Sequence, residues 1–143
     1  MFSAILNVLR GYRTSFDALE NAIFAEVRRT LPVSVQGRFD DRLRRINIIQ
    51  APLGKLELNL YEKRRGAILF SDSSRIVTTD DSIHIATVKL ESADEMSRLK
   101  AKLFCGSGVL TSVEFNQPSE HADVDNITGM KVQLVSGVPW VGQ

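Results

Sequence analysis

An alternating apolar stretch that leads into a charged turn constrains the fold of this chain more than any other feature. Residues 54–70 read GKLELNLYEKRRGAILF. Three leucines alternate there with polar or aromatic residues, which is the period of a half-buried strand: Leu56, Leu58 and Leu60. The charged segment 62–66 separates them from a second apolar run at 67–70. The stretch therefore predicts a β-hairpin.

Helical periodicity dominates the chain before this hairpin. Residues 3–10 fit a short helix that needs packing to be stable, or alternatively a mobile turn. Residues 16–31 carry apolar side chains at steps of three and four, with Thr14 or Ser15 as the expected N-cap and Pro32 as the stop. The first 32 positions therefore predict a helix over residues 16–31, and either a helix or a mobile turn over residues 3–10.

A third helix is expected over residues 34–50, where apolar side chains again recur at helical spacing. Its last part, residues 46–49, is rich in β-branched side chains and would also suit a strand. Periodicity over the whole segment favours the helix.

Strand patterns dominate the chain after the hairpin. A short β-rich piece covers residues 75–79, and longer strands are predicted at 83–90, 109–115 and 130–135. Both faces of 83–90 are largely apolar, so this strand is expected to be central and covered on both sides.

One further helix is expected between two of these strands. Ser92 and Glu95 have the spacing of a capping box, and Met96, Leu99 and Leu103 follow on one helical face. A helix of about three turns should therefore end near Gly106.

The order of these patterns, helices first and strands later, is typical of the α+β class. We expect one domain over residues 1–143. In it the N-terminal helices pack on a mainly antiparallel sheet of about four to six strands, with one inserted helix.

Composition limits the cellular compartments and the kinds of partner that we expect for this chain. The formal net charge is +1, but it divides into +5 over residues 1–65 and −4 over residues 66–143. The chain has a single cysteine, which favours a reducing environment. We find no signal-like start and no apolar run of the roughly 20 residues that span a bilayer, so a cytoplasmic protein without membrane contact is expected.

Catalytic and metal-binding patterns are weak. His84 falls within a predicted strand and is expected to be a satisfied core or edge histidine. His121 stands in an acidic loop, residues 120–125, whose carboxylates could hold a cation, although a solvated loop is the simpler interpretation. Cys105 is expected to be a small buried hydrophobe at the end of the inserted helix, and residues 106–108 a helix-to-strand turn. No cofactor is expected.

Basic residues offer a candidate contact surface. Seven of them could form a patch, but acidic residues are interspersed and few aromatics accompany them, so nucleic acid is not the expected partner. The seven are Arg38, Arg42, Arg44, Arg45, Lys63, Arg64 and Arg65. We select the hairpin turn, Lys63, Arg64 and Arg65, as a candidate interaction surface. Trp140 is expected either to pack on the core or to belong to that surface.

Two functional hypotheses follow. The first is a small protein-binding domain of a regulatory or toxin-neutralising, immunity-type kind, because size, a single cysteine and the lack of a catalytic pattern are typical of many such bacterial proteins. The alternative is a small-molecule-binding or enzymatic domain with a pocket between helices and sheet near Tyr61, His84 and Glu114. The sequence leans against an enzyme and leaves the oligomeric state open.

Overall fold

The computed structural model describes residues 11–52, 54–92, 98–119 and 122–143. These contain two α-helices, α2 (Ala18–Thr30) and α3 (Val33–Arg45). The strands are β1 (Tyr12–Arg13), β2 (Ile48–Gln50), β3 (Glu57–Arg64), β4 (Ala67–Leu69), β5 (Ile83–Ser92), β6 (Lys100–Gly106), β7 (Val109–Phe115) and β8 (Ile127–Leu134). Short 3-10 turns, η1 (Asp72–Ser74) and η3 (Val124–Asn126), lie in the connections. The expected helix at residues 3–10 lies outside the described residues.

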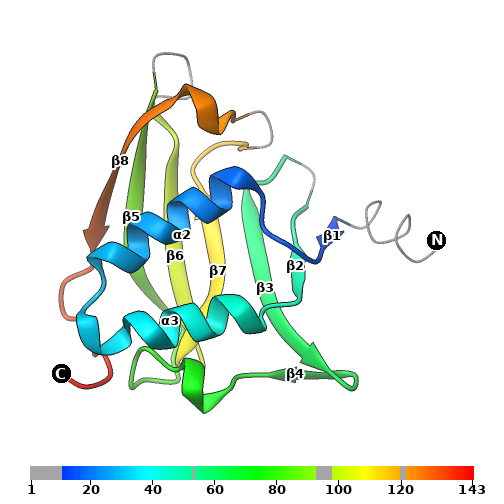
Figure 1. Cartoon of the computed structure of the whole chain (residues 1–143), viewed down its shortest axis with the longest axis vertical. Coiled ribbons are helices and arrows are strands. Elements are labelled where there is room, and N and C mark those ends of the chain that lie inside the picture. Colours follow the sequence, from blue (N-terminus) through cyan, green and yellow to red (C-terminus); the bar gives the residue numbers. More distant parts are fainter. Residues whose placement is uncertain (1–10, 53, 93–97, 120–121) are drawn as a thin grey trace.

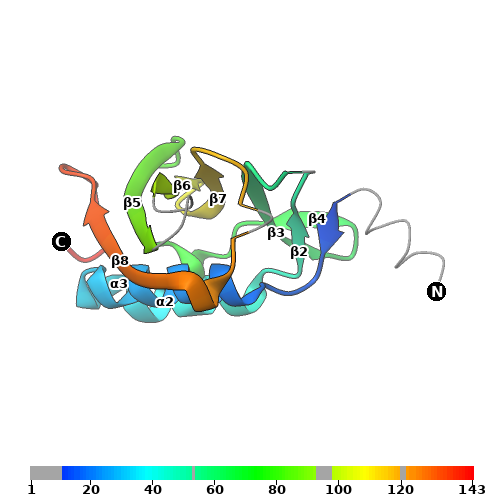
Figure 2. The same cartoon turned by 90° about the horizontal axis from the view of Figure 1, so that it is seen from above.

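The strands form an antiparallel sheet in the order β1-β2-β3-β7-β6-β5-β8, with β4 paired to β3 off this path. Both helices cross the same face of the sheet (Figure 1), and seen from above the sheet arches over them (Figure 2). The α+β class is confirmed, while the eight described strands exceed the four to six expected. Neither helix in the described part of the chain is long and apolar enough to cross a membrane.

Helix α2 forms where the periodicity predicts it, but its cap lies further along the chain. Asp17, not Thr14 or Ser15, is the N-cap, and its carboxylate accepts a hydrogen bond from the Glu20 amide at 2.8 Å. The Glu20 carboxylate accepts from the Asp17 amide in return, which completes a capping box. The helix ends at Thr30, before Pro32.

Helix α3 is shorter than expected. It ends at Arg45, and the β-branched residues that follow form β2, which pairs with β3. The strand alternative for the end of this segment is therefore correct. Ile49 in β2 is fully buried opposite Leu60, so tertiary pairing outweighs the helical periodicity that these residues also satisfy.

The helix expected after Ser92 is wrong for the part that the structure describes, since Lys100–Gly106 is β6. Alternate residues of this segment are buried: Leu99, Ala101, Leu103 and Cys105. A four-residue step fits both a helix and a strand, and here the strand pairs on both edges, with β5 and with β7. Residues 106–108 consequently join two strands, with Ser107 and Gly108 at positive φ, instead of joining a helix to a strand.

Strand β5 has a neighbour on each edge, but only one of its faces is covered. Ala86, Val88 and Leu90 on one face are buried, whereas Lys89 on the other face is exposed. A bulge between His84 and Ala86 shifts the register and explains why both faces look apolar in the sequence. The strand expected at 75–79 is reduced to one bridge, Val77 to Trp140.

Candidate functional site

The three residues of the expected pocket lie on the sheet face that the helices do not cover. Leu60 and Val113 are buried on the inner face, so the residues that follow them, Tyr61 and Glu114, point to the opposite, outer face. His84 pairs with Phe104 on this same outer face. The space between helices and sheet is instead filled by packed side chains such as Val27, Phe39, Leu60 and Leu103, all 0 or 1% exposed.

His84 is held by neighbours on its own strand. Its Nε2 lies 2.9 Å from the Ala86 carbonyl oxygen and 3.0 Å from the Thr87 hydroxyl. Because a carbonyl can only accept, Nε2 carries the hydrogen. The ring also packs on Phe104 with centroids 5.2 Å apart. These contacts satisfy His84 as expected and leave it no catalytic partner among the described residues.

The acidic loop and the cysteine give no chemical site in the described residues. His121 lies outside them. The Asp123 carboxylate accepts from the Asp125 amide at 3.0 Å, and no group of His, Cys, Asp and Glu there has the arrangement of a metal site. Cys105 is fully buried, and burial raises the pKa of its thiol to about 12, so it is a packed, protonated side chain as expected.

The seven basic residues divide into three environments. Arg42 is 1% exposed and donates to two strand carbonyls, so it belongs to the interior. Arg38 lines a cleft at the end of the sheet. The remaining five lie at the surface near the β3–β4 hairpin: Arg44, Arg45, Lys63, Arg64 and Arg65. The sequence does carry a signal for this, because Arg42 is three residues after Phe39 and seven after Val35, which places it on the buried face of the helix.

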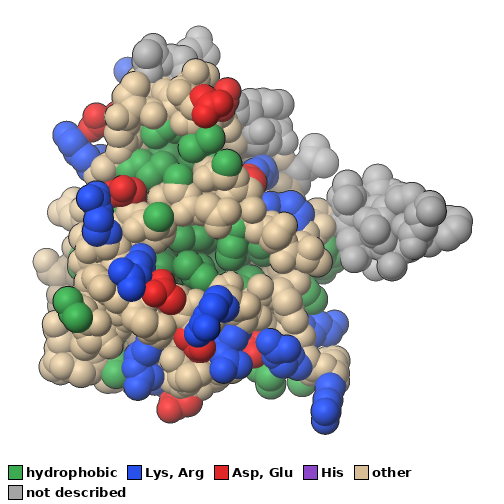
Figure 3. Space-filling model, in the orientation of Figure 1, with side chains coloured by type: hydrophobic (Ala, Val, Ile, Leu, Met, Phe, Trp, Pro, Cys, Tyr) green, Lys and Arg blue, Asp and Glu red, His purple; other side chains and the backbone are tan. Residues whose placement is uncertain are grey.

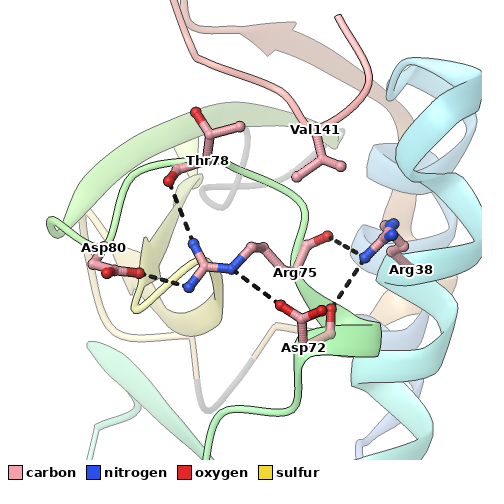
Figure 4. Close-up of a pocket in the computed structure, with 6 residues that line it drawn as sticks. All are labelled: Arg38, Asp72, Arg75, Thr78, Asp80 and Val141. Atoms are coloured by element: carbon pink, nitrogen blue, oxygen red, sulfur yellow. Dashed lines mark hydrogen bonds and ion pairs between the residues drawn. The ribbon is translucent and has the colours of Figure 1, made fainter.

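The cleft, of about 450 Å³, is formed where α3, the connection after β4 and the C-terminal segment meet (Figure 4). Arg38 Nη1 donates to the Asp72 and Arg75 carbonyl oxygens at 3.0 and 3.4 Å. Arg75 Nη2 donates to the Asp80 carboxylate at 2.6 Å, and its Nη1 donates to backbone carbonyls of residues 77 and 78.

These bonds hold the connection between β4 and β5 against α3 and in a fixed conformation. Both carboxylates of the cleft, Asp72 and Asp80, pair with Arg75, while Arg38 bonds to backbone carbonyl oxygens, so two cations stand beside two anions. Arg75 also packs so closely on Gly108 that a Cβ there would lie 2.5 Å from its Nη1. Both arginines already bond to the protein, which gives them a structural role in the cleft.

The β3–β4 hairpin carries a different kind of surface. We call Lys63, Arg64, Arg65, Ile68 and Phe70 the hairpin surface. Ile68 is 43% and Phe70 48% exposed, which makes them two of only four large hydrophobic residues exposed in the described chain. The hairpin extends beyond the helices in Figure 1, and Lys and Arg side chains gather over it and the end of α3 in Figure 3.

The hairpin surface is held on a rigid base. Glu62 on β3 is 1% exposed and accepts hydrogen bonds from the Ser71 hydroxyl at 2.7 Å and from Arg64 Nε at 3.1 Å. Burial alone would raise the pKa of Glu62, but these bonds and the charges of Arg45 and Arg64 outweigh burial and lower it. Glu62 is therefore ionised and fixes one side of the hairpin.

Asn47 fixes the other side. Its side chain donates to the Lys63 carbonyl oxygen and accepts from the Lys63 amide, both at 2.8 Å, as a paired strand would. The side chains of Lys63 and Arg65 form no ion pair with any described residue. Two cations thus remain unmatched beside two exposed apolar side chains.

Trp140 does not belong to this surface. It is 8% exposed, packs in the main core and forms a backbone bridge with Val77. Of its two expected roles, packing is the one that the structure shows.

Comparison with known proteins adds no relationship. No family model, curated protein or solved structure matches this chain.

Proposed function

We propose that this chain is a protein-binding domain that recognises its partner through the hairpin surface, in keeping with an immunity-type or regulatory role. The observation that carries the proposal is the combination of exposed Ile68 and Phe70 with the unmatched cations Lys63 and Arg65. Apolar anchors next to uncompensated charge are the composition of a protein contact, and they favour a partner with carboxylates around an apolar centre.

The rigid base of the hairpin supports the same proposal. A contact surface that is already ordered loses little conformational entropy when it binds. Glu62, Asn47 and the buried leucines of β3 hold the hairpin in one conformation without the partner. The protein thus presents its anchors at low entropic cost.

Site-specific photo-crosslinking in a cell extract of the source organism tests the proposal. A benzophenone side chain at position 68 should give a discrete adduct with one partner. The same group at position 33 is the control, because Val33 is apolar and 85% exposed but lies at the start of α3, away from the hairpin. Equal adducts at both positions would contradict the proposal.

Charge reversal gives the matching test of the cations. Lys63→Glu with Arg65→Glu should reduce the adduct at position 68 at least fivefold and leave the circular dichroism spectrum unchanged, because neither side chain is ion-paired within the described chain. Arg29→Glu is the control, since this arginine is 78% exposed at the end of α2 and far from the hairpin. If both changes have the same effect, the cations have no specific part in binding.

A small-molecule or enzymatic function has less support. The described cleft has balanced charges and arginines that are already bonded. The residues of the expected pocket, Tyr61, His84 and Glu114, lie on an outer sheet face.

A further inference from the structure

We infer that the partner binds by adding an extended segment as a new strand along the outer edge of β4, with apolar side chains at its centre and carboxylates at the end beside the turn. This inference rests on the proposed function and specifies how the hairpin surface is used. It follows from which backbone groups of the hairpin face outward.

The turn between β3 and β4 fixes which peptide groups face outward. Arg65 and Gly66 both have positive φ, at 53° and 81°, which is the two-residue type I′ turn. In such a hairpin the flanking pair Arg64 and Ala67 exchange hydrogen bonds, and so does the pair Glu62 and Leu69. The N–H and C=O of Ile68 therefore point away from β3, toward the open edge.

This edge is free among the described residues. Strand β4 lies off the main path of the sheet and pairs with β3 alone. On the other edge of β3, the Asn47 side chain occupies the Lys63 backbone groups. Around Lys63, a new strand thus finds backbone hydrogen bonds only at β4.

The side chains along the open edge of the hairpin are those of a strand that accepts a partner strand, and they are not the kind that blocks pairing. Proteins usually guard an open edge with charges or proline. Here the edge carries Ile68 and Phe70, which alternate to the same face and are both largely exposed. An added strand would bring its own apolar side chains beside them, since neighbouring strands lie about 5 Å apart.

Charge sets the chemistry of the end of the added segment that lies beside the turn. Lys63 pairs with Ile68 across the hairpin, and Arg65 lies in the turn. Neither forms an ion pair within the described chain, so carboxylates near the turn would find two cations to pair with. Main-chain bonds would supply affinity and these side chains specificity, as in other cases of strand addition.

A titration with three synthetic peptides tests this inference, followed by NMR of the labelled full chain. The first is acetyl-Glu-Glu-Val-Thr-Val-Glu-Glu-amide. The second replaces each Glu with Lys. The third has the sequence of the first but carries N-methyl groups on the amides of all three central residues, which removes the central donors on both edges of the strand.

We expect the acidic peptide to shift the amides of Ile68 and Phe70 and to slow hydrogen exchange at Ile68. The lysine peptide and the N-methylated peptide should each bind at least tenfold more weakly. Ile68→Pro should abolish binding of the acidic peptide while the chain stays folded, because the N–H that it removes is not used by β3. Ile68→Val is the conservative control and should bind as the original chain does.

The failures of the two proposals can be told apart. If the N-methylated peptide binds as tightly as the acidic one, strand addition is overturned while a protein contact at the hairpin surface stands. If no peptide shifts these amides at millimolar concentration, the inference is overturned, and the adduct at position 68 decides the proposed function separately. If the amides shift with protein concentration alone, the edge takes a second copy of this chain, which also overturns the inference.

Discussion

Arg42 Nε donates a hydrogen bond of 2.8 Å to the carbonyl oxygen of Leu110, 68 positions further along the chain. Its Nη2 donates to the Leu60 carbonyl at 3.2 Å. The pairing of β3 with β7 ends at Asn59 and Ser112, and the two strands diverge beyond this pair. The carbonyl groups of Leu60 and Leu110 lie just past this last pair, so β3 and β7 do not bond to each other there. The buried guanidinium therefore bridges the gap from which the β3–β4 hairpin leaves the sheet.

Replacement of Arg42 should destabilise the fold strongly. Arg42→Met leaves two buried carbonyls without a donor, which costs about 2 to 4 kcal/mol in the free energy of unfolding. Urea denaturation measures this cost. Arg44→Met is the matched control on the same helix, because its side chain is 74% exposed, and it should change stability by less than about 0.5 kcal/mol. Equal losses in the two variants would contradict the bridging role.

Asp41 should make stability depend on acid pH. The Ser74 hydroxyl donates to its carboxylate at 2.6 Å and Arg45 Nε donates at 2.8 Å. These contacts, led by Ser74, lower the pKa of Asp41 from 3.8 to about 2. Because the folded pKa lies below the unfolded one, this stability is present above about pH 4 and is lost as the pH falls through 2.

Asp41→Asn is the variant that checks this dependence. We expect a loss of about 1 to 2 kcal/mol in the free energy of unfolding at pH 7, and a smaller difference from the original chain at pH 2. Asp40→Asn removes the same charge from a carboxylate that is 43% exposed and should have the smaller effect. A constant difference between Asp41→Asn and the original chain from pH 7 to pH 2 would argue against the prediction.

Cys105 should be unreactive until the protein opens. Its thiol is fully buried in β6, and burial raises its pKa to about 12, so the thiolate that reacts with disulfide reagents is scarce at neutral pH. Labelling with an aromatic disulfide should be slow in buffer and fast above the urea midpoint. Fast labelling in buffer, at the rate of a free thiol, would show that β6 is not packed as described.

A row of lysines on the outer sheet face should lower stability. Lys89 pairs directly with Lys100 on one side and with Lys131 on the other. Like charges in opposite positions repel, so Lys89→Glu should raise the melting temperature and add about 0.5 to 1 kcal/mol to the free energy of unfolding. Lys89→Gln should give a smaller gain. A loss of stability in both variants would mean that the lysines do not repel one another.

Local sequence patterns were sufficient to predict those helices and strands whose periodicity fits only one kind of secondary structure. The stripe of Phe16, Leu19, Ile23 and Val27 fits a helix and no strand, and α2 forms there. The alternation of Leu58 and Leu60 and the Arg-Gly turn likewise predict the β3–β4 hairpin. Even the choice of Lys63, Arg64 and Arg65 as a candidate surface depended only on a charged turn between two strands.

Where a pattern has two interpretations, only the tertiary structure decided. Leu99 and Leu103 are four residues apart, a step that suits a helical face and also one face of a strand. Pairing with β5 and β7 makes this segment a strand. The sequence likewise determined that Arg42 is charged, but only the divergence of β3 and β7 provides the carbonyls that bury it. Strand pairing and side-chain burial depend on residues that are distant in the chain, and so they cannot be deduced from the residues that are adjacent in sequence.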